Sequence, residues 1–494
     1  MKIKVISRSE KQHTRETKDQ LHKVQHNPDP IVHPFERPRE YVRALNATKL
    51  DRVFAKPFIG ALTGHRDGVY TMKRHPKQLT SLVSGSADGE IRQWNLASQT
   101  TNWSVNAHKG FVRGVCFCYS SDGLDNRILS CGTDKTIKCW NLDKLREGQT
   151  SSTTTTSNAA GSSASHASSL LSSSNTTSTG QTNNTVISGV YQCDRPAEMW
   201  LGEHAFYTID DQRETSQFAT ASASKVDVWD YERSSPIDSY EWGYGSVIYV
   251  AFNPIQHNVL GACTSDREVV LYDTRASSGV RKVSLSMRSN QLAWNPMEAF
   301  NFSVANEDRN VYTFDMRKLS RAINIQKDHL DAVTSLDYSP TGRELVTGSY
   351  DCTIRLYQVN SSRSRDVYHT KRMQRVFAVQ FSGDARFVFS GSDDTNIRVW
   401  KSGAADHIGT MTLREKRADA YKKKLKKRFK HVPEVRSIAN HQHLPKPLYR
   451  KRLLDHEMKS SKARKNRNKR VHMRPENAPK WVHDKQKVIE QQIQ

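Results

Sequence analysis

Histidine, serine or threonine, and aspartate recur together in this 494-residue chain, and the same residue types form the catalytic triads of hydrolases. The first two sets, each ending in a tryptophan, contain His65, Asp88, Trp94, His108, Asp134 and Trp140. A triad is needed once per active site, whereas these residues repeat along the chain. The Gly-x-Ser-x-Gly, Walker A, His-Glu-x-x-His and Cys-x-x-Cys signatures are absent from the sequence. We therefore expect these residues to be structural, the protein not to be an enzyme, and no metal or cofactor to be bound.

The repeated phrase is an aspartate followed six residues later by an aromatic residue, and its spacing predicts the fold. The aromatic residues are Trp94, Trp140, Trp229, Tyr272, Phe314, Tyr357 and Trp400. Their successive intervals are 46, 89, 43, 42, 43 and 43 residues, and a period of about 40 to 45 is that of a four-stranded WD40 blade. The copy ending at Trp229 lacks the aspartate, and the long interval contains a Ser/Thr-rich tract at 148–189.

These observations predict an all-β fold, a seven-bladed WD40 β-propeller over residues 61–400. Small residues and aspartate favour a tight turn, and the alternation that follows buries one side of a strand. The His, Ser or Thr, Asp and Trp residues then resemble the hydrogen-bonded tetrad of WD40 blades. The tract at 148–189 is expected to be a disordered insert between the third and fourth strands of blade 2.

Cysteine use and hydropathy argue against a secreted or membrane protein. Seven irregularly spaced cysteines form no disulfide framework, which suggests a reducing compartment. Residues 1–19 are polar and charged, unlike a signal peptide, and no apolar run is long enough to cross a bilayer. We therefore expect no membrane partner.

The net charge of +24 is concentrated at the two ends of the chain. Residues 1–60 contain 13 Lys and Arg against 7 Asp and Glu, residues 61–400 contain 35 of each kind, and residues 401–494 contain 27 against 9. A neutral propeller with cationic ends suggests a body that docks on proteins while its ends bind a polyphosphate such as RNA.

Residues 401–494 are predicted to contain a basic helix and then a disordered tail. The helix is expected within Thr412–Val432 and to end at Pro433. Its apolar stripe consists of Leu413, Tyr421, Leu425 and Phe429. The cations around this stripe, expected to contact RNA phosphates, are Lys422, Lys423, Lys424, Lys426, Lys427, Arg428 and Lys430. Alternatives are binding to a ribosomal protein, to calmodulin or to a membrane surface, or packing of the stripe on the propeller.

The second basic segment, Lys459–Arg474, has almost no apolar residue to bury. We therefore expect it to be disordered until it binds an anionic partner. Its candidate RNA-binding residues are Lys462, Arg464, Lys465, Arg467, Lys469 and Arg470. The same run of basic residues is similar to a nuclear import signal.

Residues 1–60 are predicted to form an arm that is first extended and then helical. Several prolines at 27–35 exclude a helix there. From Glu36 to about Lys56, apolar residues recur at three- and four-residue steps, which indicates a one-sided helix. This helix either packs across the propeller or offers its apolar face to a partner.

Segments outside the repeat pattern resemble the suppressor-of-fibrillarin (Sof) family of WD-repeat proteins. They are His33–Tyr41, Ala44–Leu50, Trp294–Phe302, Ala305–Asp308 and Tyr368–Gln374. The resemblance implies a non-enzymatic scaffold of the nucleus and nucleolus, acting in the small-subunit processome for pre-rRNA processing toward 18S rRNA. The partners it implies are pre-ribosomal RNA, the box C/D small nucleolar ribonucleoprotein, other processome proteins and ribosomal proteins.

Two repeat ends suggest an alternative role as a substrate receptor of a cullin-RING ubiquitin ligase. Tyr272–Arg275 and Phe314–Arg317 are similar to the WD-x-Arg box with which some WD40 proteins bind a ligase adaptor, and animal Sof relatives are grouped with such receptors. The residues of the two boxes are Asp273, Arg275, Asp315 and Arg317. In the other interpretation, each Asp and Arg only form a local ion pair at the end of a blade.

Overall fold

The computed structural model describes residues 31–118, 127–142, 195–213, 215–241, 245–276, 278–474, 476–478, 483, 485 and 490–493. Two compact units are present: Met1–Ala55 with His407–His441, and Lys56–Asp406 with Gln442–Gln494. The predicted arm before residue 31 and the predicted insert at 148–189 lie outside the described residues. Among the described helices, none has the length and apolar content needed to cross a membrane.

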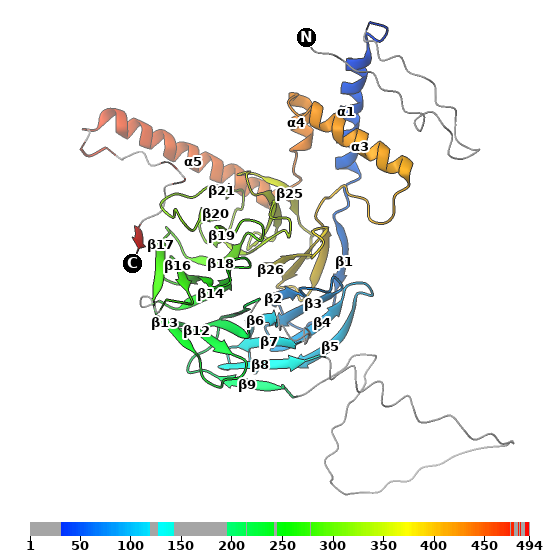
Figure 1. The fold of residues 1–494 in the computed structure, drawn as a ribbon. Coiled ribbons are helices and arrows are strands. Elements are labelled where there is room, and N and C mark those ends of the chain that lie inside the picture. Colours follow the sequence, from blue (N-terminus) through cyan, green and yellow to red (C-terminus); the bar gives the residue numbers. More distant parts are fainter. Residues whose placement is uncertain are drawn as a thin grey trace, which may run out of the picture. The chain divides into compact units, whose positions relative to one another are not determined.

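The larger unit contains seven antiparallel sheets arranged as a propeller (Figure 1). The first sheet contains β2 (Val69–Arg74), β3 (Ser81–Ser86), β4 (Glu90–Asn95) and β5 (Thr100–Asn106). The second contains β6 (Val112–Phe117), β7 (Arg127–Gly132), β8 (Thr136–Asn141) and β9 (Glu198–Leu201). The third contains β10 (Thr208–Asp211), β11 (Gln217–Ala221), β12 (Lys225–Asp230) and β13 (Asp238–Glu241). The fourth contains β14 (Val247–Phe252), β15 (Val259–Thr264), β16 (Glu268–Asp273) and β17 (Gly279–Ser284).

The remaining sheets complete the ring. The fifth contains β18 (Ser289–Trp294), β19 (Asn301–Asn306), β20 (Asn310–Asp315) and β21 (Asn324–Lys327). The sixth contains β22 (Val333–Tyr338), β23 (Glu344–Ser349), β24 (Ile354–Gln358) and β25 (Ser364–Tyr368). The seventh contains β26 (Val376–Phe381), β27 (Phe387–Ser392), β28 (Ile397–Lys401) and β1 (Phe58–Leu62).

The ring is closed by β1, which pairs antiparallel with β28 and serves as the outer strand of the seventh sheet. The predicted boundary between residues 60 and 61 falls inside this strand, because a strand from the start of the chain completes the last blade. β8 and β9 are the third and fourth strands of the second sheet, and the residues between them from 143 to 194 lie outside the described ranges.

The same local chemistry builds most blades. All seven aromatic residues of the repeated phrase are buried, each on the third strand of its sheet. In the turns before these strands, the residue after aspartate has a positive φ, as in Gly89, Lys135 and Cys352. A Cβ on Gly89 would lie 2.0 Å from the His108 carbonyl oxygen, so this turn requires glycine. The neighbouring sheets bury both faces of their inner strands, which explains why every residue of β3 is buried.

The larger unit also contains α5 (Lys446–His472) and β29 (Glu490–Ile493), and β29 pairs antiparallel with β17. The prediction of disorder at Lys459–Arg474 is wrong for the part within α5. Low apolar content means that this segment has no core to bury, but the backbone hydrogen bonds of a helix are local and need none. Lysine, arginine, alanine and methionine favour helix, and a proline lies in the first turn.

The smaller unit is built from α1 (Glu36–Val53), α3 (Leu413–Arg428) and α4 (Pro433–Ala439). Thr412 and Glu415 form a capping box that begins α3. The helix ends at Arg428, and Pro433 begins α4 instead of ending α3, because proline fits the first position of a helix.

The helices of the smaller unit pack on one another. Ala44 and Ala47 of α1 are buried, as are Leu425 of α3 and Val435 of α4, and α1 contacts both other helices. Within the stripe predicted on α3, Leu425 is buried, whereas Leu413 and Tyr421 are exposed. The sequence did not reveal this pairing of α1 with α3.

Candidate functional site

The second blade contains the complete tetrad. His108 Nε2 lies 2.9 Å from Ser130 Oγ, and His108 Nδ1 lies 2.9 Å from an Asp134 carboxylate oxygen. Trp140 Nε1 donates to the same Ser130 Oγ at 3.0 Å. The hydroxyl that a triad would use as its nucleophile is therefore fully buried and held by two ring nitrogens. Burial lowers the pKa of His108 more than Asp134 raises it. The arrangement holds β7, β8 and the turn between them against the loop that precedes β6.

The first blade differs from the prediction, because Asp88 does not contact His65. His65 Nε2 lies 2.6 Å from Ser84 Oγ, to which Trp94 Nε1 donates at 2.7 Å. The carboxylate 3.4 Å from His65 Nδ1 belongs to Glu90, while Asp88 only accepts a hydrogen bond from the Glu90 backbone N–H. The longer Glu90 side chain reaches the histidine from two residues further along the turn. Burial raises the pKa of Glu90, but contacts with His65 and Arg92 outweigh burial and lower it.

We expect Glu90→Gln to lower the free energy of unfolding by about 1–3 kcal/mol, because a partly buried carboxylate with two cationic or imidazole partners is lost. Asp88→Asn should cost less than about 1 kcal/mol, because asparagine still accepts the turn hydrogen bond. Urea unfolding followed by tryptophan fluorescence measures both changes. A larger loss of unfolding free energy for Asp88→Asn than for Glu90→Gln would contradict the assignment of Glu90 as the carboxylate partner of His65.

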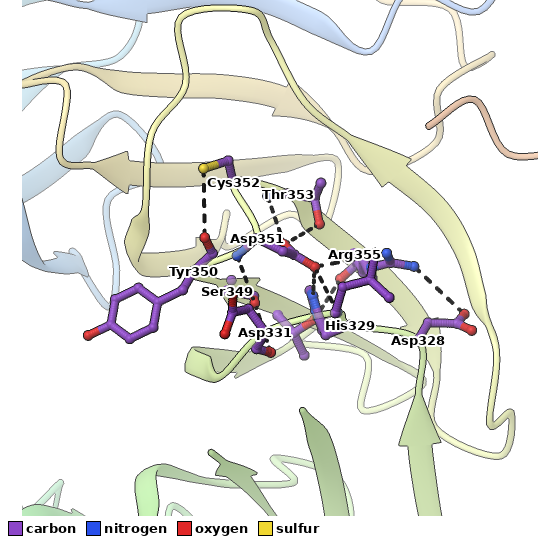
Figure 2. Close-up of polar contacts among 12 residues, drawn as sticks. Asp328, His329, Asp331, Ser349, Tyr350, Asp351, Cys352, Thr353 and Arg355 are labelled. Atoms are coloured by element: carbon purple, nitrogen blue, oxygen red, sulfur yellow. Dashed lines mark hydrogen bonds and ion pairs between the residues drawn. The ribbon is translucent and has the colours of Figure 1, made fainter. Parts of the chain in front are cut away.

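The sixth blade contains the most buried polar network (Figure 2). His329 lies 3.0 Å from Asp351 and 2.7 Å from Thr347 Oγ1. The Arg355 guanidinium, which is completely buried, lies 3.9 Å from Asp351 and 4.0 Å from Asp328. Two carboxylates thus compensate one buried cation, which is the condition for keeping such a charge in a protein interior. The repeated phrase predicted Asp351, six residues before Tyr357, but it did not indicate Arg355.

Cations of α3 divide into those paired with α1 and those left to solvent. Lys426 forms an ion pair with Asp51, and Arg428 forms one with Glu40. Lys423 pairs with Asp419 of its own helix at 2.9 Å. The candidate cations that are exposed and form no ion pair with any described residue are Lys422, Lys424, Lys427 and Lys430. Of the seven predicted phosphate contacts on this segment, these four are therefore available.

The cations of α5 are exposed along the whole helix. The helix has eleven Lys and Arg against two Asp and Glu, and none of its residues is buried. The candidates Lys462, Arg464, Lys465, Arg467, Lys469 and Arg470 are all exposed in its C-terminal half. A helix of 27 residues spans about 40 Å, so these groups form one long cationic surface.

The N-terminal part of α5 and the segment before it attach to the fifth and sixth blades. Asp455 pairs with Arg309 at 3.1 Å, and Lys451 pairs with Asp331 at 2.9 Å. Gln442 donates to the Ser364 carbonyl oxygen at the start of β25. The C-terminal half of the helix runs beyond the sheets (Figure 1). Anchoring thus uses one acid and one base of α5 and leaves most of its cations free for a ligand.

The two WD-x-Arg-like boxes lie at the ends of β16 and β20, on neighbouring blades. Arg275 binds Asp273 through two nitrogens at 3.0 and 2.8 Å, and Arg317 binds Asp315 at 3.1 and 2.9 Å. These hydrogen bonds lower the pKa of both aspartates. The local ion pairs of the second interpretation are therefore present. Both arginine side chains remain largely exposed, at 71% and 62%, so a partner can still reach them.

Within the described ranges, no group of three or more His, Cys, Asp or Glu is arranged to hold a metal ion. The polar clusters are the blade tetrads, and the extended charged features are α3 and α5. The chain is a WD40 β-propeller protein, and WD domain, G-beta repeat models match residues 56–95, 99–141, 320–358 and 366–401. The crystal structure of the WD40 β-propeller domain of Doa1 has the same fold, with a TM-score of 0.52 and 16% identity over 70% of this chain and 96% of that one.

Comparison of whole sequences defines the family more narrowly. A Sof1-like domain matches residues 402–489, which include α3, α4 and α5. The chain is 42% identical to "DDB1- and CUL4-associated factor 13" of Danio rerio over 99% of both chains, and 46% identical to the protein of that name in Dictyostelium discoideum over 95% of both. It is 41% identical to "Protein SOF1" of Saccharomyces cerevisiae, over 95% of this chain and 91% of that one. The chain therefore belongs to the family of Sof1-like WD-repeat proteins, as the resemblance predicted.

Proposed function

We propose that the protein is a non-enzymatic scaffold in nucleolar ribosome biogenesis that binds pre-ribosomal RNA through α5. The observation that carries the proposal is that the N-terminal part of α5 is anchored to the blades by ion pairs, while its C-terminal part is cationic and unburied. Such a surface suits a polyphosphate, whose binding gains from the release of counterions. Family membership with "Protein SOF1" and the neutral propeller, which has room to dock on proteins, support the same assignment.

In this mechanism the propeller positions the cations, and the cations neutralise phosphates. The Asp455–Arg309 and Lys451–Asp331 ion pairs fix the direction in which α5 leaves the blades. The exposed lysines of α3 add a second phosphate-binding surface. Contacts of this kind position RNA without reading its sequence. The small-subunit processome, the box C/D small nucleolar ribonucleoprotein and the ribosomal proteins are the partners proposed for the assembly.

Crosslinking in cells followed by sequencing of the bound RNA tests this function. We expect enrichment of pre-ribosomal RNA with the wild-type protein and its loss when Lys462, Arg464, Lys465, Arg467 and Lys469 are changed to glutamine. Changing the same number of propeller lysines and arginines provides the control for net charge. Equal enrichment with the α5 variant, or RNA that is not ribosomal, would refute the proposal.

A second candidate function is that of a substrate receptor in a cullin-RING ubiquitin ligase. It is favoured by the exposure of Arg275 and Arg317 on adjacent blades and by the name of the relatives, "DDB1- and CUL4-associated factor 13". If the boxes bind an adaptor, the double change Arg275→Ala and Arg317→Ala should reduce recovery of DDB1 in a pulldown at least about tenfold. Arg288→Ala is the matched control, because Arg288 is also exposed and pairs with Glu307 at 2.7 Å. Unchanged recovery would remove this candidate.

A further inference from the structure

The innermost strands contact one another around the ring and line, among others, a cavity of about 220 Å³. Six of them shift register at their second residue against the next strand, and a bulge of this kind re-aims a side chain. The bulged residues are Tyr70, Arg113, Ile248, Asn290, Thr334 and Phe377. The third blade supplies Tyr207, directly before β10. All seven line the cavity, so each blade contributes one side chain to what we call the channel mouth.

The polar side chains on one part of the channel mouth are satisfied by the protein. Asn290 Nδ2 donates to the Val333 carbonyl oxygen at 2.8 Å, and Thr334 Oγ1 donates to the Val376 carbonyl oxygen at 2.5 Å. These two residues link neighbouring blades and have little capacity left for a ligand. They are structural parts of the ring.

The other part of the channel mouth is aromatic and holds an arginine. Tyr70 and Phe377 stack with their ring centroids 4.3 Å apart, and Phe111 meets Tyr70 edge-on at 5.6 Å. The Arg113 guanidinium carbon lies 5.8 Å from the Tyr70 ring centroid, 5.2 Å from that of Phe111 and 6.0 Å from that of Tyr207. Three rings thus hold one cation in a fixed place. This is a preorganised group and not a mobile surface charge.

Arg113 differs from Lys73 and Arg74 because its side chain forms no ion pair or hydrogen bond with any residue that the structure describes. Lys73 lies 3.1 Å from Asp210, and Arg74 donates to the carbonyl oxygens of Phe381 and Ser382. No carboxylate among the described residues forms an ion pair with Arg113, and its Nε is buried without a hydrogen-bond partner. In the same cavity, the Ser335 hydroxyl is also buried and unpartnered. Buried polar groups are normally paired, so Arg113 and Ser335 give this cavity hydrogen-bonding capacity that the described residues do not use.

We propose that the channel mouth binds an acidic side chain, Asp or Glu, inserted by a segment of a partner protein, with Arg113 as its counterion. A planar guanidinium suits a carboxylate, and the surrounding rings exclude water from the pair. A protein partner fits better than RNA because the carboxylates of Asp67 and Asp393 lie near Tyr70 of the channel mouth and would repel the run of phosphates in a nucleic acid. Asp393 lies next to Gly68, and burial together with the charges of Asp393 and Asp67 raises the pKa of Tyr70. Several phosphates of an RNA would lie close to these carboxylates and be repelled by them. A peptide can instead place a single carboxylate beside Arg113.

The surface extends outward from the cavity through Tyr350, which is 40% exposed. Its ring meets Phe377 edge-on at 6.1 Å, and Figure 2 shows it pointing away from the buried His329–Asp351 network. The segment flanking the acidic anchor therefore has an aromatic surface on which to lie. This site goes beyond the proposed function, since it uses neither α5 nor RNA.

Selection of a random ten-residue peptide library on the purified full-length protein tests the site. We expect the selected peptides to share Asp or Glu at one position, and a Glu→Gln change in such a peptide to weaken binding at least about thirtyfold. Arg113→Gln should cause a loss of the same size. Arg113→Glu should instead select peptides with Lys or Arg at that position. Because the Glu→Gln change is made in the peptide, the test holds even if a variant protein folds poorly.

Arg375→Gln is the matched control, because this arginine also lies over an aromatic ring, that of Tyr350, but is exposed and does not line the cavity. Its peptide affinity should stay within about twofold of the wild type, as expected for a rim charge. Three outcomes would overturn the proposal: no peptide selected, a basic residue selected by the wild-type protein, or a single-stranded RNA whose binding depends on Arg113. Loss of RNA binding by α5 variants would leave this result unchanged, so the two proposals fail separately.

Discussion

Asp351→Asn is expected to lower the free energy of unfolding by about 3–5 kcal/mol, because it removes one partner of a buried charge network. Arg355 would be left with Asp328, 4.0 Å away, as its single compensating carboxylate among the described residues. Asparagine is nearly isosteric, so the loss reports the charge and not a cavity. Urea unfolding of the full-length protein measures the change. The slope of the unfolding free energy against urea concentration should be the same for the variant and the wild type.

Asp331→Asn is the control for this variant. Asp331 lies two residues from His329, but its side chain is 46% exposed and pairs with the similarly exposed Lys451. An ion pair of that kind contributes less than about 1 kcal/mol. If the two substitutions had equal effects, the buried network would not be the source of stability.

The contribution of Asp351 should also disappear in acid. Burial raises the pKa of this carboxyl, but His329, Arg355 and Thr353 outweigh burial and hold the pKa well below its ordinary value. The folded state therefore keeps the carboxylate ionised at a pH where the unfolded chain binds a proton. The stabilisation is complete above about pH 4 and falls as the pH drops toward the folded pKa. Melting curves at pH 7, 4 and 3 should show the gap between the wild type and Asp351→Asn narrowing below pH 4.

The stabilisation that depends on His329 is also lost as the pH falls, but at a higher pH than that of Asp351. Burial lowers its pKa more than Asp351 raises it, so the folded protein binds the proton less readily than the unfolded chain does. Its contribution is complete above about pH 6.5 and is lost as the pH falls below that value. A wild-type protein more stable at pH 5 than at pH 7.5 would contradict this assignment.

The blades could be predicted from the sequence because each one repeats the same burial requirement. Trp94, Trp140 and Trp400 occupy the same strand position, and a period of about 43 residues leaves little freedom in the fold. The partner of His65 could not be predicted, since the choice between Asp88 and Glu90 depends on how far a side chain reaches across a turn. The repeat therefore predicts the backbone of each blade, but it does not predict which carboxylate contacts the histidine.

The structure of the two ends of the chain was harder to predict from the sequence than that of the blades. Asp51 and Lys426 are separated by 375 positions, and no local pattern indicates that such residues meet. In α5, composition correctly indicated that nothing would be buried, but it did not exclude a helix stabilised by local hydrogen bonds and by anchors at one end. The bulges that aim Tyr70 and Arg113 into the channel depend on register between strands, which the sequence alone does not specify.

Neutralising α5 should reduce RNA binding and its dependence on salt together. The variant changes Lys462, Arg464, Lys465, Arg467 and Lys469 to glutamine, which keeps helix propensity. Five phosphate contacts make the slope of log affinity against log salt concentration steeper by about four. Over a fourfold rise in salt, the wild type should therefore lose about 250-fold more affinity than the variant. Titration of a labelled pre-rRNA fragment at salt concentrations from about 50 to about 200 mM measures this difference.

Anchoring gives this prediction a second and independent test. Asp455→Asn removes the partner of Arg309 but no cation of α5, so it should leave the salt slope unchanged. If the ion pair orients the helix, however, this variant should lose pre-rRNA crosslinks in cells while it still binds a short RNA in vitro. Equal loss in both assays would mean that Asp455 supports folding of α5 and not its direction. A neutralised α5 that kept the wild-type slope would show that the phosphates are bound elsewhere, with Lys422, Lys424, Lys427 and Lys430 of the other unit as the next residues to change.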